Sequence, residues 1–451
     1  MDQSQSQIQS QIQINMDGGA SKKSTSTSNK LLNINYPYAK TWDKEKNYAT
    51  FEIKNIKNSL ANSLRRVMMV EVPTVGFKSE PYEESKINII QNDSPLHNQF
   101  LAHRIAMIPL NIPFPEKFDT DDYEFIIDVY NDSNFPKDVT SNDIKIRKIS
   151  DDRILQEETT RKMLPLDPIT EEPIVITRLK PEYYQYGNIN NANIISSLQG
   201  ESQYSNKKMR LYVTAKANIS TGQDNGHYSP VSCSVFTNKV DPEKAALAEK
   251  QFIEEHNEKM ANNELTPSTP AELKRRFEVS LKERHFYTDK TDEPYHFEFK
   301  IESVGVIPPL VIFSRAISIL KDKITNFRND LMQGNENKII ISPSSSLSGA
   351  FQVVIKGEDD TLGNVIQSYF NQLYCSYNDN NRLLNYFGYI KPHPLVNEIH
   401  MTVQPSSGTK SFPDLIETIF NPGCMHIIRQ LNSISVDLEK SPQFISEMKK
   451  I

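Results

Sequence analysis

The pattern of apolar positions predicts an amphipathic helix near the start of the chain. Between Asn58 and Thr74, apolar residues recur three or four positions apart, so they share one face of a helix. Asn58 is a suitable N-cap residue, and Pro73 cannot continue a helix. The buried stripe predicted by this spacing comprises Leu60, Leu64, Val67 and Met68. The side or opposite face carries Asn62, Arg65, Arg66 and Met69.

A second helix is predicted after Pro308 and Pro309. Its apolar positions alternate steps of three and four residues, which is the heptad rhythm of a helix that packs along another helix. They are Leu310, Phe313, Ile317, Leu320, Ile324, Phe327 and Leu331. This spacing is the strongest packing signal in the chain.

A third helix is predicted close behind residue 360, with Thr361 or Asp360 as its cap. Its apolar stripe comprises Leu362, Ile366, Tyr369 and Leu373, and Val365 and Phe370 widen it. Extended segments are expected at Ile390–Leu395 and Ile399–Gln404.

The last apolar pattern runs from Leu415 to about Ile434 and has helical spacing. Pro422 followed by Gly423 interrupts it, because both residues are unfavourable inside a helix. The sequence therefore predicts a broken last helix.

Alternation of polar and apolar residues predicts strands elsewhere. Tyr48–Lys54 and Tyr295–Ser303 each alternate and are expected to form half-buried strands. Residues 76–227 contain short extended runs separated by Pro, Asp and Asn, which predicts an inserted, mostly β domain. Within it, residues 181–206 are rich in Tyr, Asn, Gln and Ser and are expected to form a surface loop. Pro242–Ala261 is rich in Ala, Glu and Lys and is expected to be helical.

Composition marks the segments between these elements. Residues 1–34 are dominated by Gln, Ser, Asn and Lys and are predicted to form a disordered tail. Residues 333–349 are rich in Gly, Asn and Ser, which favours a linker. The predicted domains are 1–34, 35–75 together with 228–332, 76–227, 333–349 and 350–451.

The charge and the cysteine content of the chain argue against several classes of function. The 451 residues carry a formal net charge of −6 and the pI is near 5.9, which argues against a dedicated nucleic-acid binder. The three cysteines, Cys233, Cys375 and Cys424, are too far apart for a CxxC metal site and too few for a disulfide framework, so a reducing compartment is expected. No apolar run approaches the roughly 18 residues of a membrane span, and no secretory signal pattern opens the sequence.

Candidate catalytic and metal-binding residues are few. His97 and His103 lie six positions apart, which turns them about 240° from each other on a helix, so a shared zinc site is not expected. Glu358, Asp359 and Asp360 could be imagined to bind magnesium, but they precede a helix whose exposed N–H groups favour carboxylates. No phosphate-binding loop, nucleophile elbow or Cys–His nucleophile set is present. No catalytic residue, cofactor or metal is therefore predicted.

Several motifs resemble one protein family. Asn58–Thr74 resembles the first helix of the α-like subunits of cellular RNA polymerases, namely bacterial α, archaeal D and the third subunit of eukaryotic RNA polymerase II. Leu96–Leu110, Gly226–Pro230 and Ile301–Pro309 resemble further motifs of this family, in the family's order.

The sequence beyond residue 350 resembles the smaller partner of that family. Phe351–Asn364 and Gly388–Leu395 are similar to motifs of the eleventh subunit of RNA polymerase II and of archaeal L. Both halves of a heterodimer would then lie in one polypeptide, as in fusions encoded by large cytoplasmic DNA viruses. If the chain comes from such a virus, the resemblance implies that the protein is located in the virion and the host cytoplasm. If it does not, the resemblance implies an intracellular location.

The resemblance implies an α+β fold in which two halves of one chain form the α-like dimerisation fold, with helices packed on small antiparallel sheets. It implies a non-catalytic assembly platform of a multisubunit DNA-directed RNA polymerase. Expected partners are the second-largest, largest and small polymerase subunits, with DNA reached only through the complex and no membrane. The face expected to bind partners comprises Asn62, Arg65, Arg66, His103 and Arg104. The expected dimer face comprises Leu60, Leu64, Met68, Leu310, Phe313, Ile317, Leu320, Ile324, Phe327, Leu362, Ile366 and Tyr369.

Two alternatives stay open from the sequence. A stand-alone nucleic-acid-binding protein would show tight, salt-sensitive binding of DNA by the free chain. A hydrolase would depend on residues such as His97, His103 or Asp360.

Overall fold

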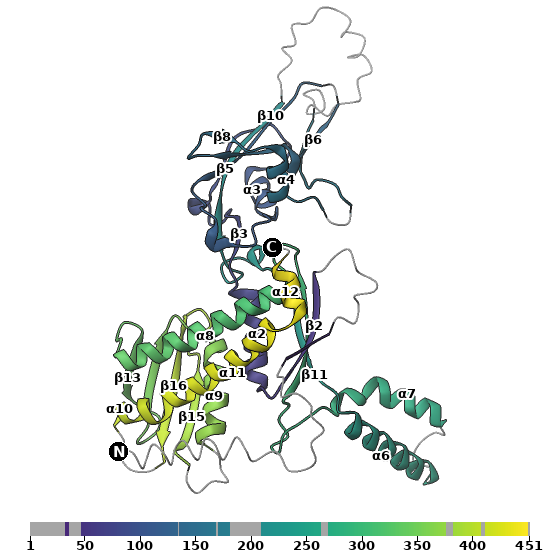
Figure 1. Cartoon of the computed structure of the whole chain (residues 1–451), viewed down its shortest axis with the longest axis vertical. Coiled ribbons are helices and arrows are strands. Elements are labelled where there is room, and N and C mark those ends of the chain that lie inside the picture. The colour runs from purple at the N-terminus through teal and green to yellow at the C-terminus, as the bar shows by residue number, and fades with distance from the viewer. Residues whose placement is uncertain are drawn as a thin grey trace, which may run out of the picture.

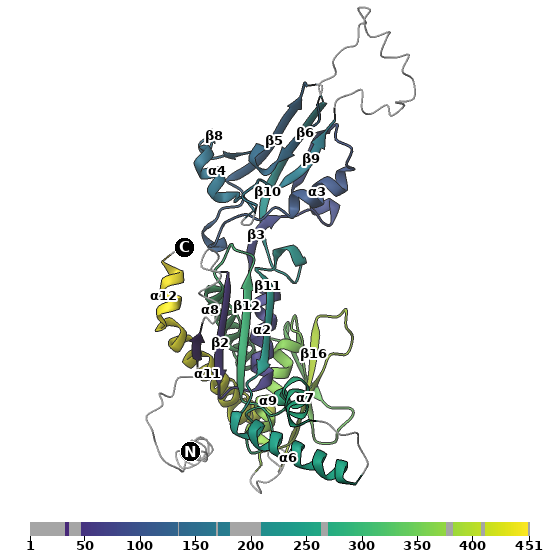
Figure 2. The same cartoon turned by 90° about the vertical axis from the view of Figure 1, so that its right-hand side faces the viewer.

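The computed structural model describes residues 32–35, 47–133, 135–167, 170–180, 209–262, 269–375, 382–406 and 411–449. These residues confirm the predicted α+β class, since helices pack on small antiparallel sheets (Figure 1). An inserted domain extends along the long axis of the molecule, away from the rest of the described chain, which we call the helical body (Figures 1 and 2). The predicted tail up to residue 31 and the predicted loop 181–206 lie outside the described residues.

The first sheet belongs to the helical body and has the antiparallel strand order β1-β2-β12-β11. Its strands are β1 (Leu32–Asn35), β2 (Tyr48–Lys54), β11 (Val231–Asn238) and β12 (His296–Ser303). In β2 the predicted alternation holds from Phe51 to Lys54, because Phe51 and Ile53 are buried whereas Glu52 and Lys54 are partly exposed, but Thr50 on the polar side is buried as well. Strand β1 begins inside the range predicted as a tail, because pairing with β2 supplies order that composition does not reveal.

Two long helices pack on this sheet and confirm two helix predictions. They are α2 (Asn58–Val70) and α8 (Pro309–Gln333). The predicted cap of α2 is wrong, because Asn58 is already helical and Lys57 occupies the N-cap position without a capping side chain. Helix α8 ends at Gly334, whose φ of 65° is a left-handed conformation that glycine adopts without a Cβ clash.

The inserted domain has its own sheet and its own hydrophobic core. The order is β3-β10-β5-β7-β8, β4 also pairs with β10, and β6 pairs with β9. The strands are β3 (Thr74–Phe77), β4 (Ile87–Asn92), β5 (Tyr123–Asn131), β6 (Lys137–Thr140), β7 (Ile144–Lys148), β8 (Arg153–Ile154), β9 (Val175–Leu179) and β10 (Met209–Ser220). Its helices are α3 (Asn98–Ala106) and α4 (Glu157–Met163).

A pair of helices, α6 (Pro242–Ala261) and α7 (Pro270–Ser280), projects from the body between β11 and β12 (Figure 1). Helix α6 confirms the expected helix over these residues. Short 3-10 turns lie at Tyr82–Glu84, Pro115–Lys117, Ser141–Asp143, Gly226–Tyr228 and Lys282–Arg284.

The C-terminal part forms a second four-stranded sheet with the order β13-β14-β16-β15. Its strands are β13 (Ile339–Pro343), β14 (Phe351–Lys356), β15 (Leu384–Ile390) and β16 (Glu398–Pro405). The helices are α9 (Asp360–Tyr374), α10 (Phe412–Leu415), the π-helical turn η7 (Ile416–Phe420), α11 (Asn421–Glu439) and α12 (Pro442–Met448).

Four expectations for this part need correction. The predicted linker 333–349 contains β13, because three consecutive isoleucines supply an edge strand for the second sheet. The expected strand Ile390–Leu395 is instead the end of β15 and a turn that two prolines impose. Asp359, rather than Thr361 or Asp360, is the N-cap of α9, and its carboxylate accepts the Thr361 N–H at 2.9 Å. The last helix is continuous through Pro422. A π-helical turn precedes this proline, and the wider hydrogen-bond spacing of that turn accommodates a proline within the helix.

Candidate functional site

One hydrophobic core joins helices that are far apart in the sequence. Helix α2 contacts both α8 and α9, and α11 contacts α8 and α9. The residues expected on the dimer face all lie buried in this core: Leu60, Leu64, Met68, Leu310, Phe313, Ile317, Leu320, Ile324, Phe327, Leu362, Ile366 and Tyr369. Each buried side chain of this size contributes about 1.5–3 kcal/mol relative to exposure, so the helices around α2 stabilise one another.

Tyr369 adds a polar link inside this core. Its side chain is 1% exposed, its hydroxyl donates to Gln430 Oε1 of α11 at 2.5 Å, and it lies 3.5 Å from the Lys57 backbone nitrogen at the start of α2. Burial raises the pKa of Tyr369 well above its usual range, so the hydroxyl keeps its proton. Apolar spacing placed this residue on the helix face but gave no sign of the hydroxyl's partners.

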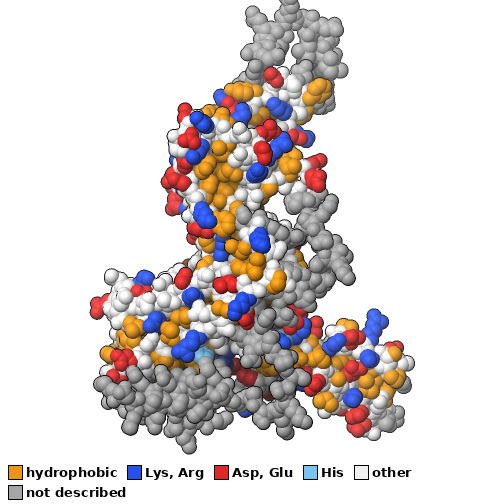
Figure 3. Space-filling view, in the orientation of Figure 1, with side chains coloured by type: hydrophobic (Ala, Val, Ile, Leu, Met, Phe, Trp, Pro, Cys, Tyr) orange, Lys and Arg blue, Asp and Glu red, His pale blue; other side chains and the backbone are white. Residues whose placement is uncertain are grey.

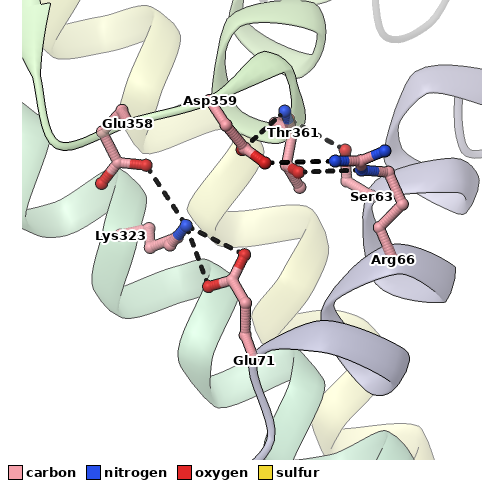
Figure 4. Close-up of polar contacts among 7 residues, drawn as sticks. All are labelled: Ser63, Arg66, Glu71, Lys323, Glu358, Asp359 and Thr361. Atoms are coloured by element: carbon pink, nitrogen blue, oxygen red, sulfur yellow. Dashed lines mark hydrogen bonds and ion pairs between the residues drawn. The ribbon is translucent and has the colours of Figure 1, made fainter. Parts of the chain in front are cut away.

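A group of polar side chains, which we call the clasp cluster, lies where α2, α8 and the start of α9 meet (Figure 4). It comprises Ser63, Arg66, Glu71, Lys323, Glu358, Asp359 and Thr361. Its members come from three elements of the body, so it ties the first part of the chain to the last.

Helix α2 reaches α9 through two side chains of the clasp cluster. Arg66 donates from Nη2 to Asp359 Oδ2 and from Nε to Thr361 Oγ1, each at 3.1 Å. Ser63, one turn earlier on α2, donates to the Thr361 carbonyl oxygen at 3.0 Å. These contacts fix the rotation of α2 against the first turn of α9 (Figure 4).

Lys323 of α8 bridges two carboxylates on different elements. Its Nζ lies 2.9 Å from Glu71 Oε2 at the end of α2 and 3.2 Å from Glu358 Oε2 before α9. All three side chains are at most 22% exposed, so water screens these charges only in part.

The charges of the clasp cluster depend on one another. Burial alone would lower the pKa of Lys323, but the carboxylates of Glu358 and Glu71 outweigh burial and hold that pKa above its ordinary value. Burial raises the pKa of Glu358, and Lys323 offsets only part of that rise. For Asp359, burial would also raise the pKa, but hydrogen bonds from Thr361 and the nearby cations bring it below the ordinary value.

The structure separates the two arginines that sequence analysis placed together on the outer face. Arg66 is engaged with Asp359 and Thr361, whereas the hydrogen bonds of the Arg65 side chain stay within its own helix, at Asn62 Oδ1 (3.1 Å) and the sulfur of Met69 (3.4 Å). The physical reason is the helical turn of about 100° per residue, which directs adjacent side chains to different neighbours. Among the described residues, no carboxylate pairs with Arg65.

His103 and Arg104, the other residues expected to bind partners, lie on α3 of the inserted domain and are exposed. Arg104 donates to the carbonyl oxygens of Ile176 and Val175, each at 2.7 Å, which ties α3 to β9. They belong to the part of the chain with the second core, so they do not join the clasp cluster. His97 caps α3, since its Nδ1 accepts the Gln99 N–H at 3.3 Å.

Within the described ranges, no group of three His, Cys, Asp or Glu side chains is arranged to hold a metal ion. The helices found there also include none that combines the length and apolar character of a membrane span. The geometry of the described site is that of an interface between elements, with an apolar core and charged pairs at its edge.

Comparison with known proteins gives a family match over much of the chain. The model of the RNA polymerase Rpb3/Rpb11 dimerisation domain matches residues 50–324. This range includes α2 and the inserted domain and ends within α8, so α9 and α11 lie beyond it.

Three relatives show the level of similarity. A conjugation stage-specific protein of Tetrahymena thermophila is 24% identical over 325 residues, covering 64% of this chain and 93% of that protein. Subunit RPAC1 of DNA-directed RNA polymerases I and III of Saccharomyces cerevisiae is 24% identical over 321 residues, covering 62% and 83%. DNA-directed RNA polymerase subunit Rpo3 of Thermococcus kodakarensis is 26% identical over 308 residues, covering 65% and 96%.

Proposed function

The chain belongs to the RNA polymerase Rpb3/Rpb11 dimerisation domain family, and from this premise we propose that it is a non-catalytic assembly subunit of a multisubunit DNA-directed RNA polymerase. Residues 35–75 and 228–332 act as the third-subunit-like half, and residues 350–451 act as the eleventh-subunit-like half. Their pairing provides the platform on which the large catalytic subunits assemble.

One observation carries this proposal. Helix α2 lies within the family match, α9 lies beyond it, and the two are packed into one core with α8 and α11. Because both halves are on one chain, pairing is intramolecular, with an effective concentration in the millimolar range for a short linker. Assembly of the polymerase then needs one bimolecular step fewer.

The second-largest subunit is the proposed partner of the α2 surface around Asn62 and Arg65. Arg65 is suited to this role, because its guanidinium can donate two parallel hydrogen bonds to a carboxylate and no carboxylate among the described residues pairs with it. His103 and Arg104 provide a second contact on the inserted domain, and Arg66 supports the surface by holding α2 against α9. The largest and small subunits complete the proposed set of partners.

The charge of the chain supports the proposal that it reaches DNA only as part of the polymerase complex. The formal net charge is −6. On the face shown in Figure 3, acidic and basic side chains are interspersed and no broad basic surface gathers. If the chain derives from a large cytoplasmic DNA virus, as the joined halves suggest, it would act in the virion and the host cytoplasm.

Co-expression of the tagged chain with the second-largest subunit of its polymerase tests the proposal. We expect the two to purify together, and Arg65→Glu to abolish co-purification while leaving the chain folded by circular dichroism, because it places like charge against the partner's carboxylate. Arg276→Glu, an exposed arginine on α7, is the matched control and should purify with the partner as the unaltered chain does. Full binding by Arg65→Glu would remove the arginine from the proposed interface.

A further inference from the structure

Strand β13 forms an open edge of the second four-stranded sheet, at the margin of the helical body (Figure 1). Among the described residues it pairs with β14 alone, and the register is unbroken from Ile339 to Pro343. The opposite edge strand, β15, has a register shift between Leu384 and Tyr386. Such irregularities protect an edge, because they disturb the row of main-chain groups that another strand would need. Strand β13 has no irregularity of this kind.

The hydrogen bonds between β13 and β14 show which main-chain groups face outward. At one end of the strand, the Lys356 N–H donates to the Lys338 carbonyl oxygen at 2.9 Å. At the other end, the Ser344 N–H donates to the Ala350 carbonyl oxygen at 2.8 Å. Hydrogen-bonded pairs alternate with non-bonded pairs along an antiparallel ladder. The even-numbered residues of β13 therefore face β14, and the odd-numbered residues face the open edge.

This edge offers three acceptors and one donor. The acceptors are the carbonyl oxygens of Ile339, Ile341 and Pro343, and the donor is the Ile341 N–H. The Ile339 N–H already donates to the Asn335 carbonyl oxygen at 2.9 Å, and proline has no N–H. Two copies of β13 would together supply only two N–H groups, so pairing of copies would leave most acceptors without a bond. A different extended segment, with an N–H at every second residue, satisfies all four groups.

A hollow beside the edge accepts side chains of such a segment. It has a volume of about 510 Å³ and lies between β13 and the end of α8, with Leu331, Ile339 and Ile341 among its lining residues. Ile339 and Ile341 lie on the same face of the sheet, because side chains alternate along a strand. Ile341 is 38% exposed. An apolar residue directly opposite it on an added strand would lie on that face, enter the hollow and cover Ile341.

The hollow also carries negative charge. Asp330 and Glu336 line it, and Lys338 lies 3.3 Å from the Asp330 carboxylate. Glu336 is exposed, and no cation among the described residues pairs with it. In an added antiparallel strand, the residue two positions after the one opposite Ile341 lies opposite Ile339, at the end of β13 nearer to Glu336. A lysine or arginine at that position complements the charge.

We propose that β13 binds an extended, proline-free peptide segment of another protein as an additional antiparallel strand. The segment has an apolar residue opposite Ile341 and a lysine or arginine two residues later, which pairs with Glu336. Main-chain hydrogen bonds provide affinity, and the hollow selects the side chains. This inference goes beyond the proposed function and does not depend on it, since it rests on β13 and the end of α8 alone.

Fluorescence anisotropy tests the proposal with the purified full chain and a labelled synthetic peptide. The peptide alternates threonine and valine, with lysine two positions after the central valine. We expect saturable binding. The same peptide N-methylated at the central valine should bind about tenfold more weakly, because it cannot donate to the Ile341 carbonyl oxygen. Equal binding of the two peptides, or no saturable binding of the first, would overturn the inference.

A variant of the chain removes the matching donor. Ile341→Pro deletes the outward N–H and leaves the bonds to β14 in place, because a strand tolerates proline where its N–H faces solvent. We expect about tenfold weaker binding of the lysine peptide. Ile341→Val is the matched control, since it keeps the N–H and should bind within about twofold of the unaltered chain. Circular dichroism checks that both variants are folded, and equal binding by the two would contradict the edge as the site.

Glu336→Gln tests the charge preference. It should weaken binding of the lysine peptide about threefold and leave binding of a peptide with threonine in place of lysine unchanged. The same loss for both peptides would remove the proposed pairing with Glu336. Light scattering of the free chain addresses a second copy as the occupant: a dimer that Ile341→Pro converts to a monomer would overturn the inference.

Discussion

At the scale of single residues, helical spacing predicts which side chains are buried but not which polar groups they meet. Leu60 and Leu64 are buried as their spacing indicated, because an apolar stripe of this width requires a partner. Arg66 shows the limit of that reasoning. Its partner Asp359 is 293 positions away, and no local pattern identifies it.

The bond from Arg66 to Asp359 should contribute measurably to stability. We expect Arg66→Ala to lower the free energy of unfolding by about 1 kcal/mol, because the pair is charged and hydrogen-bonded but partly screened by water. Arg65→Ala is the control and should change it by less than about 0.5 kcal/mol, since the hydrogen bonds of the Arg65 side chain stay within its own helix. Urea unfolding followed by circular dichroism measures both. Equal losses for the two arginines would contradict the assignment of Arg66 to the clasp cluster.

The lowered pKa of Asp359 predicts a defined pH dependence. A carboxylate whose folded pKa lies below its ordinary value, 3.8, stabilises the fold above that pH and loses its contribution as the pH falls through the folded pKa. Asp359→Asn keeps a helix-capping side chain but removes the charge. It should therefore lower stability at pH 7 and have a smaller effect below about pH 3.8. A difference from the unaltered chain that is constant between pH 7 and pH 3 would refute a role for the charge.

At the scale of elements, the wrong prediction for the last helix has a physical cause. Pro422 followed by Gly423 was interpreted as a break, but the π-helical turn before Pro422 lets the helix continue. Gly423 has a different role, because a Cβ there would lie 2.4 Å from a ring carbon of Phe370 on α9. Glycine lets α11 approach α9 closely, and only the packed structure reveals this.

Gly423→Ala should therefore destabilise the protein. We expect a loss of about 1–3 kcal/mol from overpacking against Phe370, although glycine to alanine in an exposed helix usually adds about 1 kcal/mol. Phe370→Leu removes the ring carbons that clash, so the double variant should lose less than the sum of the single ones. A stabilising Gly423→Ala variant would show that α9 and α11 are not in close contact at this position.

At the scale of the whole molecule, the family resemblance implied the α+β class and apolar spacing predicted the helices that pack, whereas the arrangement of the parts depends on contacts between distant residues. The heptad spacing of α8 indicated a helix partner, and the structure supplies α2 and α11. The isoleucines of β13 were hidden in a polar tract, so the linker to the C-terminal part is shorter than its composition indicated. The clasp cluster joins three elements, so the sequence of any one of them could not predict it.

The central claim is that the two parts of the chain hold together through the core around α2, independently of the covalent link. The most direct measurement is size-exclusion chromatography after cleavage at a protease site placed between Ser345 and Ser346, two exposed residues of the loop after β13. We predict one peak at the position of the intact 51.7 kDa chain. The same cut in a Leu64→Asp variant should give two peaks, because an unpaired charge would be buried in the core. Two separate peaks from the cut chain without that substitution would contradict the account.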